Sequence, residues 1–246
     1  MHRSRTPQEI RGALIGTLLG DSFIRGGRTF MCEQTSLNLI NVKAKLISHY
    51  TNAYPKITTR TRSSIIKGRY IKPSTTFTVG GDHNTFKKWA KVFYMFGERQ
   101  IRMSILRRLT PEGIAMWIMD DGFMYYTRSN CTRRLVLCTD AYSELSHKLM
   151  IRYFKEYHNL DCKTITHQSC KDSNKTLRLA FSAKSTQALI AKIHPFVLDE
   201  FLYKLDMHYK ESTIYSERCL PEYRMAYESI SQRMALHNLC VDEDIV

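Results

Sequence analysis

The chain has 246 residues, of which 43% are hydrophobic and 24% are charged, a composition typical of a globular protein and not of a disordered one. Its formal net charge is +14, and 20 of its 37 basic residues but only 5 of its 23 acidic residues lie in 1–110. This uneven excess indicates a polyanionic partner, most simply nucleic acid.

Secretion and membrane residence are both disfavoured. No run approaches the ~18 consecutive apolar residues of a membrane span, and no apolar signal segment follows the basic N-terminus. The seven cysteines include no CxxC pair, which favours reduced thiols. We therefore expect an intracellular protein, either in an organelle such as a mitochondrion or chloroplast or in bacterial or phage-infected cytoplasm.

The first half opens on a helix start. Thr6 and Glu9 form a capping box around Pro7, and Gly20 marks the expected end of the helix. Two strands joined by a Gly-Gly turn follow, and the second strand ends near Gln34. The later predicted elements of this half are a helix over 37–53, strands over 57–64 and 69–79, and a helix over 82–96.

The second half repeats this order. Thr110 and Pro111 repeat the helix start, and Asp121 ends the helix just as Asp21 follows the first one. The later predicted elements are a hairpin turning near Ser129 and Asn130, a helix over 143–158, strands over 163–169 and 176–182, and helices over 184–194 and 197–208. Each half reads αββαββα, which predicts subdomains at 1–109 and 110–210 followed by a helical extension at 211–246.

Three glycines stand on one face of the first helix. Gly12, Gly16 and Gly20 recur every four residues, although a glycine inside a helix costs up to about 1 kcal/mol relative to alanine. Such a stripe of small residues predicts that another backbone approaches this helix closely.

Carboxylates follow the helix in both halves, as Asp21 in the first and as Asp120 and Asp121 in the second. A carboxylate at a helix C-terminus meets the negative end of the helix dipole, which is unfavourable unless a cation is bound. Two such ends brought together would form an oxygen-lined pocket suited to Mg²⁺. Metal ions there can activate water and stabilise the leaving oxygen of a phosphodiester, which is nuclease chemistry.

At these residues the chain resembles the LAGLIDADG homing endonucleases, through LIGTLLGDS at 14–22 and IAMWIMDDG at 114–122. The resemblance covers about residues 6–210 and is to the single-chain type with two motifs. It implies an α+β fold of two pseudo-symmetric αββαββα LAGLIDADG subdomains with saddle-shaped antiparallel DNA-binding sheets. The second motif is bulkier, with Met116 and Asp120 where the first has Gly16 and Gly20, so we expect an asymmetric helix interface.

The resemblance also implies the metal site. Asp21 and Asp121 are expected to bind divalent metal beside the two scissile phosphates, with help from the backbone carbonyls of Gly20 and Asp120. The expected ion is Mg²⁺, with Mn²⁺ as a substitute and Ca²⁺ binding without supporting cleavage.

Four supporting catalytic residues follow by matching positions. A cation in each half falls on Arg99 and Lys204, and only the lysine readily transfers a proton, so Arg99 is expected to act by charge. The residues expected to position water at the ends of the second strands are Gln34 and Asp140.

Basic residues on the predicted sheets are candidates for DNA contact. An antiparallel sheet can follow the major groove, where base edges are distinguishable, while arginines and lysines in loops more often meet phosphates. The candidates are Arg25, Arg28, Arg60, Arg62, Lys67, Arg69, Lys72, Arg128, Arg133, Arg134, Lys163, Lys171, Lys175 and Arg178.

Taken together, the sequence predicts a monomeric homing endonuclease that makes a metal-dependent double-strand break in a long DNA site. This interpretation requires no membrane and no protein partner. Two alternatives stay open. One is an RNA-binding maturase that acts on intron RNA with the same fold, and the other is a DNA-binding regulator descended from a nuclease. Retention of both Asp21 and Asp121 favours the enzyme.

Overall fold

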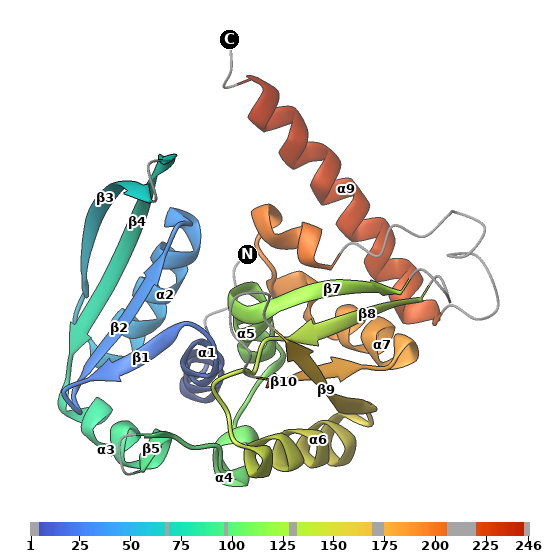
Figure 1. The fold of residues 1–246 in the computed structure, drawn as a ribbon, viewed down its shortest axis with the longest axis horizontal. Coiled ribbons are helices and arrows are strands. Elements are labelled where there is room, and N and C mark those ends of the chain that lie inside the picture. The colour runs from blue at the N-terminus through green and yellow to red at the C-terminus, as the bar shows by residue number, and fades with distance from the viewer. Residues whose placement is uncertain are drawn as a thin grey trace.

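The computed structural model describes residues 5–66, 69–95, 98–127, 132–168, 175–205 and 220–243. Two four-stranded antiparallel sheets lie on either side of a central pair of helices, α1 (Pro7–Leu19) and α5 (Pro111–Asp121) (Figure 1). This combination of helices and antiparallel sheets confirms the predicted α+β class.

Both central helices begin where the sequence predicts. The Thr6 side chain accepts the backbone N–H of Glu9 at 3.3 Å, and the Glu9 carboxylate accepts the N–H of Thr6 at 2.8 Å. In α5 the Thr110 hydroxyl accepts the N–H of Gly113 at 3.2 Å. Each cap satisfies a backbone donor that the helix leaves unpaired, which stabilises the helix by about 1 kcal/mol.

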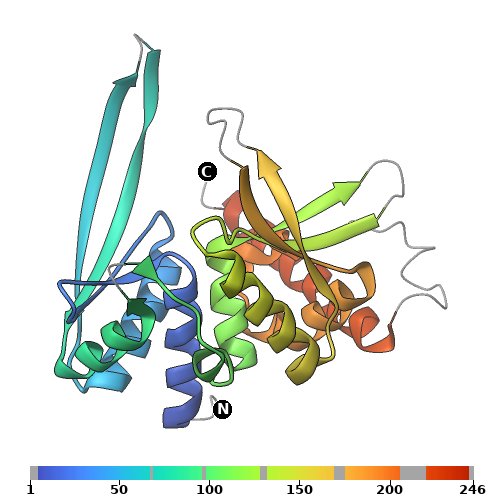
Figure 2. The same ribbon diagram turned by 60° about the horizontal axis from the view of Figure 1, so that its bottom comes forward.

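The first half follows the predicted order and forms a sheet with strand order β1-β2-β4-β3. The turn between the first two strands has φ of 57° at Gly26 and 72° at Gly27, values that glycine adopts without strain. Its later strands form a long ribbon that extends well beyond the helices (Figure 2). The elements are β1 (Ser22–Arg25), β2 (Thr29–Gln34), α2 (Leu37–Thr51), β3 (Lys56–Ile66), β4 (Arg69–Asp82) and α3 (Asn84–Phe93).

The helix expected over 82–96 is shorter than predicted. Asp82 still pairs with Thr29 in the sheet, so β4 takes up the first positions of the expected helix. His83 caps α3, since its Nδ1 accepts the backbone N–H of Thr85 at 3.2 Å. Beyond Phe93 the chain turns into a short two-stranded pairing that leads to the second half, formed by β5 (Tyr94–Met95) and β6 (Glu98–Arg99) and followed by α4 (Met103–Leu106).

The second half repeats the topology, with strand order β7-β8-β10-β9. The turn predicted near residues 129 and 130 lies outside the described residues. The elements are β7 (Gly122–Thr127), β8 (Thr132–Leu137), α6 (Glu144–His158), β9 (Cys162–Gln168), β10 (Lys175–Phe181) and α7 (Ala183–Ile193).

The helix predicted over 197–208 is wrong in its described part. Two 3-10 turns, η1 (His194–Phe196) and η2 (Asp199–Lys204), replace it, and residues 206–208 lie outside the described residues. Val197 and Leu198 have extended backbones, with ψ of 130° and 147°, so no helix can run through them. This geometry delivers the end of η2 to the end of α5.

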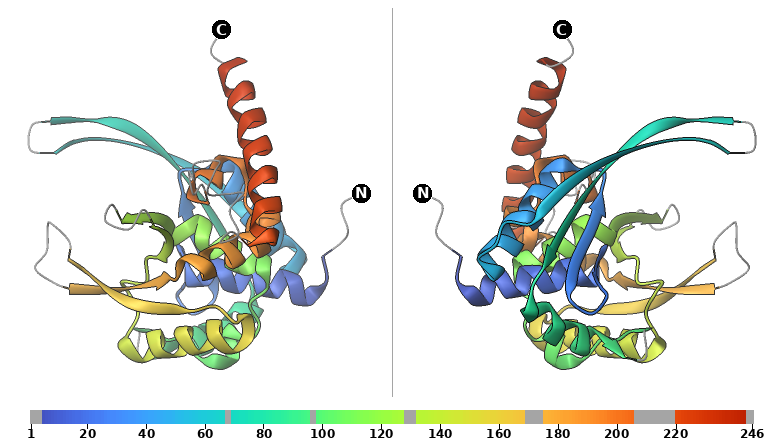
Figure 3. Two further views of the ribbon diagram at one scale, coloured as in Figure 1. Left: turned by 90° about the vertical axis from the view of Figure 1, so that its right-hand side faces the viewer. Right: turned by 90° about the vertical axis from the view of Figure 1, so that its left-hand side faces the viewer.

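The expected C-terminal helix is present as α9 (Pro221–Glu243). Its first turns bury Tyr223, Ala226 and Ile230 and pack against α7 and η2. The far end of α9 projects from the body (Figures 1 and 3).

The two central helices touch backbone to backbone. A Cβ built on Gly16 would lie 1.8 Å from the carbonyl oxygen of Gly113, and one on Gly113 would lie 2.2 Å from that of Gly12. The glycine stripe therefore has the role that its spacing predicts, since any side chain would force the helices apart.

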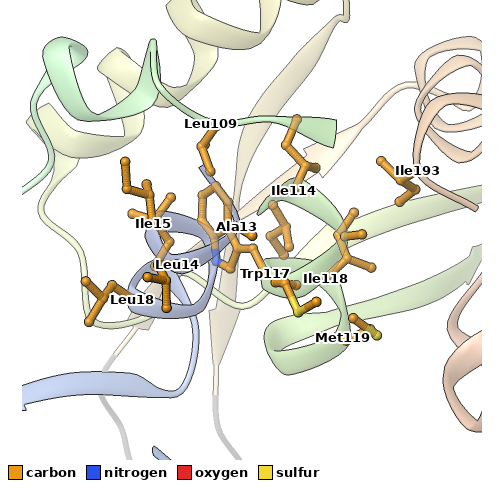
Figure 4. Close-up of a cluster of buried hydrophobic side chains, with 14 of the residues drawn as sticks. Ala13, Leu14, Ile15, Leu18, Leu109, Ile114, Trp117, Ile118, Met119 and Ile193 are labelled. Atoms are coloured by element: carbon orange, nitrogen blue, oxygen red, sulfur yellow. The ribbon is translucent and has the colours of Figure 1, made fainter. Parts of the chain in front are cut away.

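The core spreads outward from this contact. Ala13, Leu14 and Trp117 gather where α1 and α5 face each other (Figure 4), and all three are fully buried. Burying one leucine-sized side chain contributes about 1.5–3 kcal/mol, so the shared core binds the halves together. Within the described ranges, no helix is long and apolar enough to cross a bilayer.

Candidate active site

The C-terminal ends of α1 and α5 lie side by side and bring the motif aspartates together. The backbone N–H of Asp21 donates to the Asp120 carboxylate at 3.2 Å, across the junction between the halves. A Cβ at Gly20 would come within 2.5 Å of Asp120 Oδ2, so glycine is needed there to admit this carboxylate. The predicted asymmetry of the helix pair is therefore present at its end.

The three aspartates have different surroundings. Asp21 is exposed, Asp121 is half-buried, and the side chain of Asp120 is fully buried. Burial and the negative charges of Asp21 and Asp120 raise the pKa of Asp121 to about 7, although Arg99 and Lys204 oppose this. The ionised form of a carboxyl that is buried beside other carboxylates is one that a bound cation would stabilise.

The carboxylates of Asp21 and Asp121 are suitable ligands for a hard divalent cation. Mg²⁺ binds through one or two carboxylates and completes its shell with water and phosphate oxygens. Among the residues that the structure describes, no cluster of three or more His, Cys, Asp or Glu ligands is found. An ion held by Asp21 or Asp121 would therefore depend on carbonyl, water and substrate oxygens for its remaining ligands.

A cavity of about 500 Å³ opens beside Asp121. This volume is ample for a phosphodiester and its water shell. Its walls combine the end of α5 with the start of β7 and the end of η2. The lining residues are Asp120, Asp121, Gly122, Phe123, Met124, Cys138, Tyr203 and Lys204.

Lys204 reaches this cavity from η2 and caps α5. Its Nζ donates to the carbonyl oxygens of Met119 at 2.6 Å and Asp120 at 3.1 Å. Burial lowers the pKa of Lys204 below its ordinary value, although the nearby carboxylates oppose the shift. A lysine with a lowered pKa can exchange its proton more readily near neutral pH.

In the first half, Arg99 caps the C-terminal end of α1 in a similar way. Its guanidinium donates to the carbonyl oxygens of Gly20 at 3.0 Å and Ser22 at 2.9 Å. Tyr142, which the sequence did not single out, donates its hydroxyl to Leu19 O at 2.7 Å and accepts from Arg99 at 3.3 Å. Arg99 thus fixes the strand and helix end around the first aspartate.

The predicted water-positioning residues are placed differently from each other. Gln34 Nε2 donates to Asp21 Oδ2 at 2.5 Å and to Asp120 Oδ1 at 3.1 Å, so it lies within the aspartate cluster. Asp140 instead pairs with Arg178 at 3.0 Å. Partial burial acts to raise the pKa of Asp140, but the hydrogen bonds from Arg178 and Thr176 together with the charge of Arg178 outweigh it and leave this pKa below its ordinary value.

Lys43 is a site residue that sequence reasoning missed. Its Nζ lies 2.7 Å from Asp120 Oδ1 and 2.9 Å from Oδ2, and both side chains are 0% exposed. Burial acts to lower the pKa of Lys43, but the charges of Asp120 and Cys32 and the hydrogen bonds to both together outweigh it, so the pKa stays above its ordinary value. The only signal in the sequence is a lysine among the apolar positions Ile40, Ala44 and Ile47 of a helix.

The candidate DNA-contacting residues differ in whether their side chains are exposed, paired with an acidic residue or half-buried. Arg25, Arg60 and Lys163 are exposed on β1, β3 and β9. Two others are tied to acidic neighbours, Arg28 to Asp82 at 2.5 Å and Arg178 to Asp140. Arg133 and Arg134 are half-buried neighbours on one strand, so their side chains point to opposite faces. The candidates whose side chains fall outside the described residues are Arg62, Lys67, Arg69, Lys72, Arg128, Lys171 and Lys175.

Comparisons with known proteins bear on this site. Residues 11–189 match the model of the LAGLIDADG DNA endonuclease family. The DNA endonuclease I-ChuI of Chlamydomonas applanata is 24% identical over 211 residues, which cover 80% of this chain and 94% of that protein. The cytochrome b mRNA maturase bI2 of Debaryomyces hansenii is 26% identical over 208 residues, covering 80% of this chain and 74% of that protein.

A similar fold occurs in a solved structure. The homing endonuclease I-WcaI, bound to its DNA recognition sequence, matches with a TM-score of 0.64 at 21% identity. The match covers 82% of this chain and 88% of that one, so the two proteins share a fold over most of their length.

Proposed function

Because the chain belongs to the LAGLIDADG DNA endonuclease family, it is a DNA endonuclease, and we propose that Asp21 and Asp121 form its hydrolytic centre. Each aspartate serves one strand of the duplex, so that the two halves together make a double-strand break in a long DNA site. The observation that carries this proposal is the pair of adjoining helix ends, each with an aspartate and its own capping cation.

Cleavage in this family depends on a divalent metal ion, and we assign that role to Mg²⁺. When bound, the ion would lower the pKa of a water molecule and stabilise charge on the phosphate oxygens. Asp21 and Asp121 would supply its carboxylate ligands. The carbonyl oxygens of Gly20 and Asp120 each accept one hydrogen bond from Arg99 or Lys204 and keep a second lone pair for a cation.

The two capping cations have different proton chemistry. Arg99 stays charged, so in the first half it orients the helix end and lends positive charge near the scissile phosphate. Lys204 has a lowered pKa and can in addition hand a proton to, or take one from, the ordered water in its half. Gln34 holds Asp21 in place and leaves one carboxylate oxygen, Oδ1, without a bond from this amide.

The substrate is DNA, and the two sheets provide the surface for it. In Figure 2 the strands stand on one side and most of the helices on the other, which leaves the strand side for a duplex. The exposed side chains of Arg25, Arg60 and Lys163 would contact it. The similarity to I-ChuI and to the mRNA maturase bI2 favours action inside a cell or organelle.

The test replaces each aspartate by asparagine and measures Mg²⁺-dependent cleavage of a site selected from a genomic or randomised DNA library. Asp21→Asn and Asp121→Asn are each expected to lower the double-strand cleavage rate by at least about 100-fold. Asp161→Asn is the matched control, since this exposed aspartate pairs with Lys155 away from the site. Full activity in either motif variant would overturn the proposal.

A maturase role is the second candidate, favoured by the similarity to the mRNA maturase bI2. It predicts tight binding to intron RNA that does not depend on Asp21 or Asp121. RNA binding without cleavage of any DNA from the library would decide for this role.

A further inference from the structure

A buried chain of hydrogen bonds leads from α2 to the first aspartate. Lys43 holds both oxygens of Asp120, Gln34 bridges from Asp120 to Asp21, and the Asp21 N–H also donates to Asp120. The Asp120 carboxylate therefore accepts four hydrogen bonds, which use its lone pairs in full. Its side chain has no capacity left to bind a metal ion, so its role is to position other groups.

Among the described residues, this series of hydrogen bonds has no counterpart in the second half. Lys43 is the seventh residue of α2 after its Ser36 cap, and the seventh residue of α6 after its Ser143 cap is Met150, which is also fully buried. Asp120, in turn, stands where the first motif has Gly20. Asp120 of the second half thus pairs with Lys43 of the first half. The reverse pairing is absent because the corresponding residues are Met150 and Gly20.

The two asymmetries are complementary in space as well as in charge. Only glycine at position 20 leaves room for Asp120, and only a cation near it compensates a carboxylate that is removed from water. The glycine at position 20 and the lysine at position 43 therefore both accommodate the Asp120 carboxylate, which in turn is hydrogen-bonded to Asp21.

We propose that Lys43 is a positioning residue, which acts through Asp120 and Gln34 to hold Asp21 for cleavage of one DNA strand. The proposal rests on the proposed function, in which Asp21 serves one strand and Asp121 the other. Loss of these hydrogen bonds should slow cleavage of the DNA strand served by Asp21 more than cleavage of the complementary strand. The reason is that displacing a reacting group by about 1 Å can cost on the order of 100-fold in rate. The enzyme would then accumulate nicked DNA.

The test variant is the double replacement Lys43→Met with Asp120→Asn. It removes both charges together, since removing Lys43 alone would leave a buried, unpaired carboxylate and could unfold the protein. Lys45→Met is the matched control, because this exposed lysine lies on the same helix. A third variant, Gln34→Met, cuts the chain one step later and leaves the buried pair in place.

Cleavage of a duplex carrying a different fluorophore on each strand gives both rates in one reaction. The double variant is expected to slow one strand at least 10-fold more than the other, and Gln34→Met should slow the same strand. Combining all three changes should give a smaller bias than the two separate effects multiplied, because Lys43 and Asp120 act on Asp21 partly through Gln34 and partly through the Asp21 N–H. Equal slowing of both strands, or additive effects, would overturn the proposal.

A measurement without metal or substrate separates positioning from general loss of structure. Both protons of the Gln34 side-chain amide are hydrogen-bonded, so their exchange with solvent should be slow in the intact protein. The double variant should speed this exchange at least about 5-fold while backbone exchange in α1 and α5 stays unchanged. Unchanged amide exchange would contradict the proposed link. If instead Asp21→Asn cleaved normally, the proposed function would fail, whatever the state of this chain.

Discussion

The tight contact between Gly16 of α1 and Gly113 of α5 gives a sharp test of the central helix pair. Gly16→Ala places a methyl group 1.8 Å from the carbonyl oxygen of Gly113, where an ordinary contact needs about 3.4 Å or more. The obstacle is backbone, so no side-chain rotation relieves it, and α1 and α5 must separate by roughly 1.5 Å.

The expected cost follows from two opposing effects. Alanine inside a helix is intrinsically better than glycine by up to about 1 kcal/mol, so without the clash the variant would be more stable. Overpacking in a tight core costs about 1–3 kcal/mol, and a rigid contact this short lies at or beyond the upper end. We expect a net loss of about 2 kcal/mol, which lowers Tm by roughly 4–8 °C for a chain of this size.

Thermal unfolding followed by circular dichroism, together with the cleavage rate, measures both consequences. Cleavage should fall as well, because moving the helices apart also separates Asp21 from Asp121. Gly80→Ala is the control, since its methyl group would come close only to the flexible end of the Met31 side chain, at 3.1 Å, and would lie at an ordinary 3.9 Å from the Phe30 carbonyl oxygen. A Gly16→Ala protein with an unchanged or higher Tm would refute the close packing of α1 and α5.

Three further predictions follow from single contacts. Arg99→Met should lower cleavage about 10–100-fold through the loss of two charged hydrogen bonds, and Arg99→Lys should recover only part of it, because a single ammonium nitrogen replaces the two guanidinium nitrogens that bond Gly20 O, Ser22 O and the Tyr142 hydroxyl. Burial lowers the pKa of His158 to about 4, so the unfolded chain takes up the proton first as pH falls. Stability should therefore drop by about 2 kcal/mol between about pH 6.5 and 4, and urea unfolding of His158→Gln should show a shallower dependence. In salt titrations of DNA binding, Arg60→Ala should reduce the slope by about 1, while Arg28→Ala should change it less because Asp82 already pairs with that guanidinium. Equal slope changes would contradict this reading.

Much of the fold can be predicted from short-range features of the sequence. Thr6 and Thr110, each followed by proline, start the two central helices, and the glycine turn at 26 and 27 closes the first hairpin. These features act over a few residues and depend little on the rest of the chain. The same holds for the aspartates, since a carboxylate after a helix is visible in any window that contains the helix.

The features that the sequence could not predict are those that contacts with residues far away in the chain decide. The helix expected from position 197 gives way to 3-10 turns that bring Lys204 to the end of α5. Asp140 looks like the counterpart of Gln34 by position along its strand, yet it pairs with Arg178 across the sheet. Propensity along the chain could not predict either outcome, because the competing partners are remote in sequence.

The sequence by itself determined that this chain folds as two copies of αββαββα, that glycines line the contact of the motif helices, and that Asp21 and Asp121 end them. Only the tertiary structure decided what each polar group faces. A lysine on an apolar helix face could be an exposed residue, an error in the assumed face or half of an ion pair. Lys43 is the last of these, because α2 packs where the second motif delivers Asp120. Local spacing fixes which face a residue occupies, whereas its partner depends on the assembly of both halves, since a buried charge is stable only where the opposite charge also arrives.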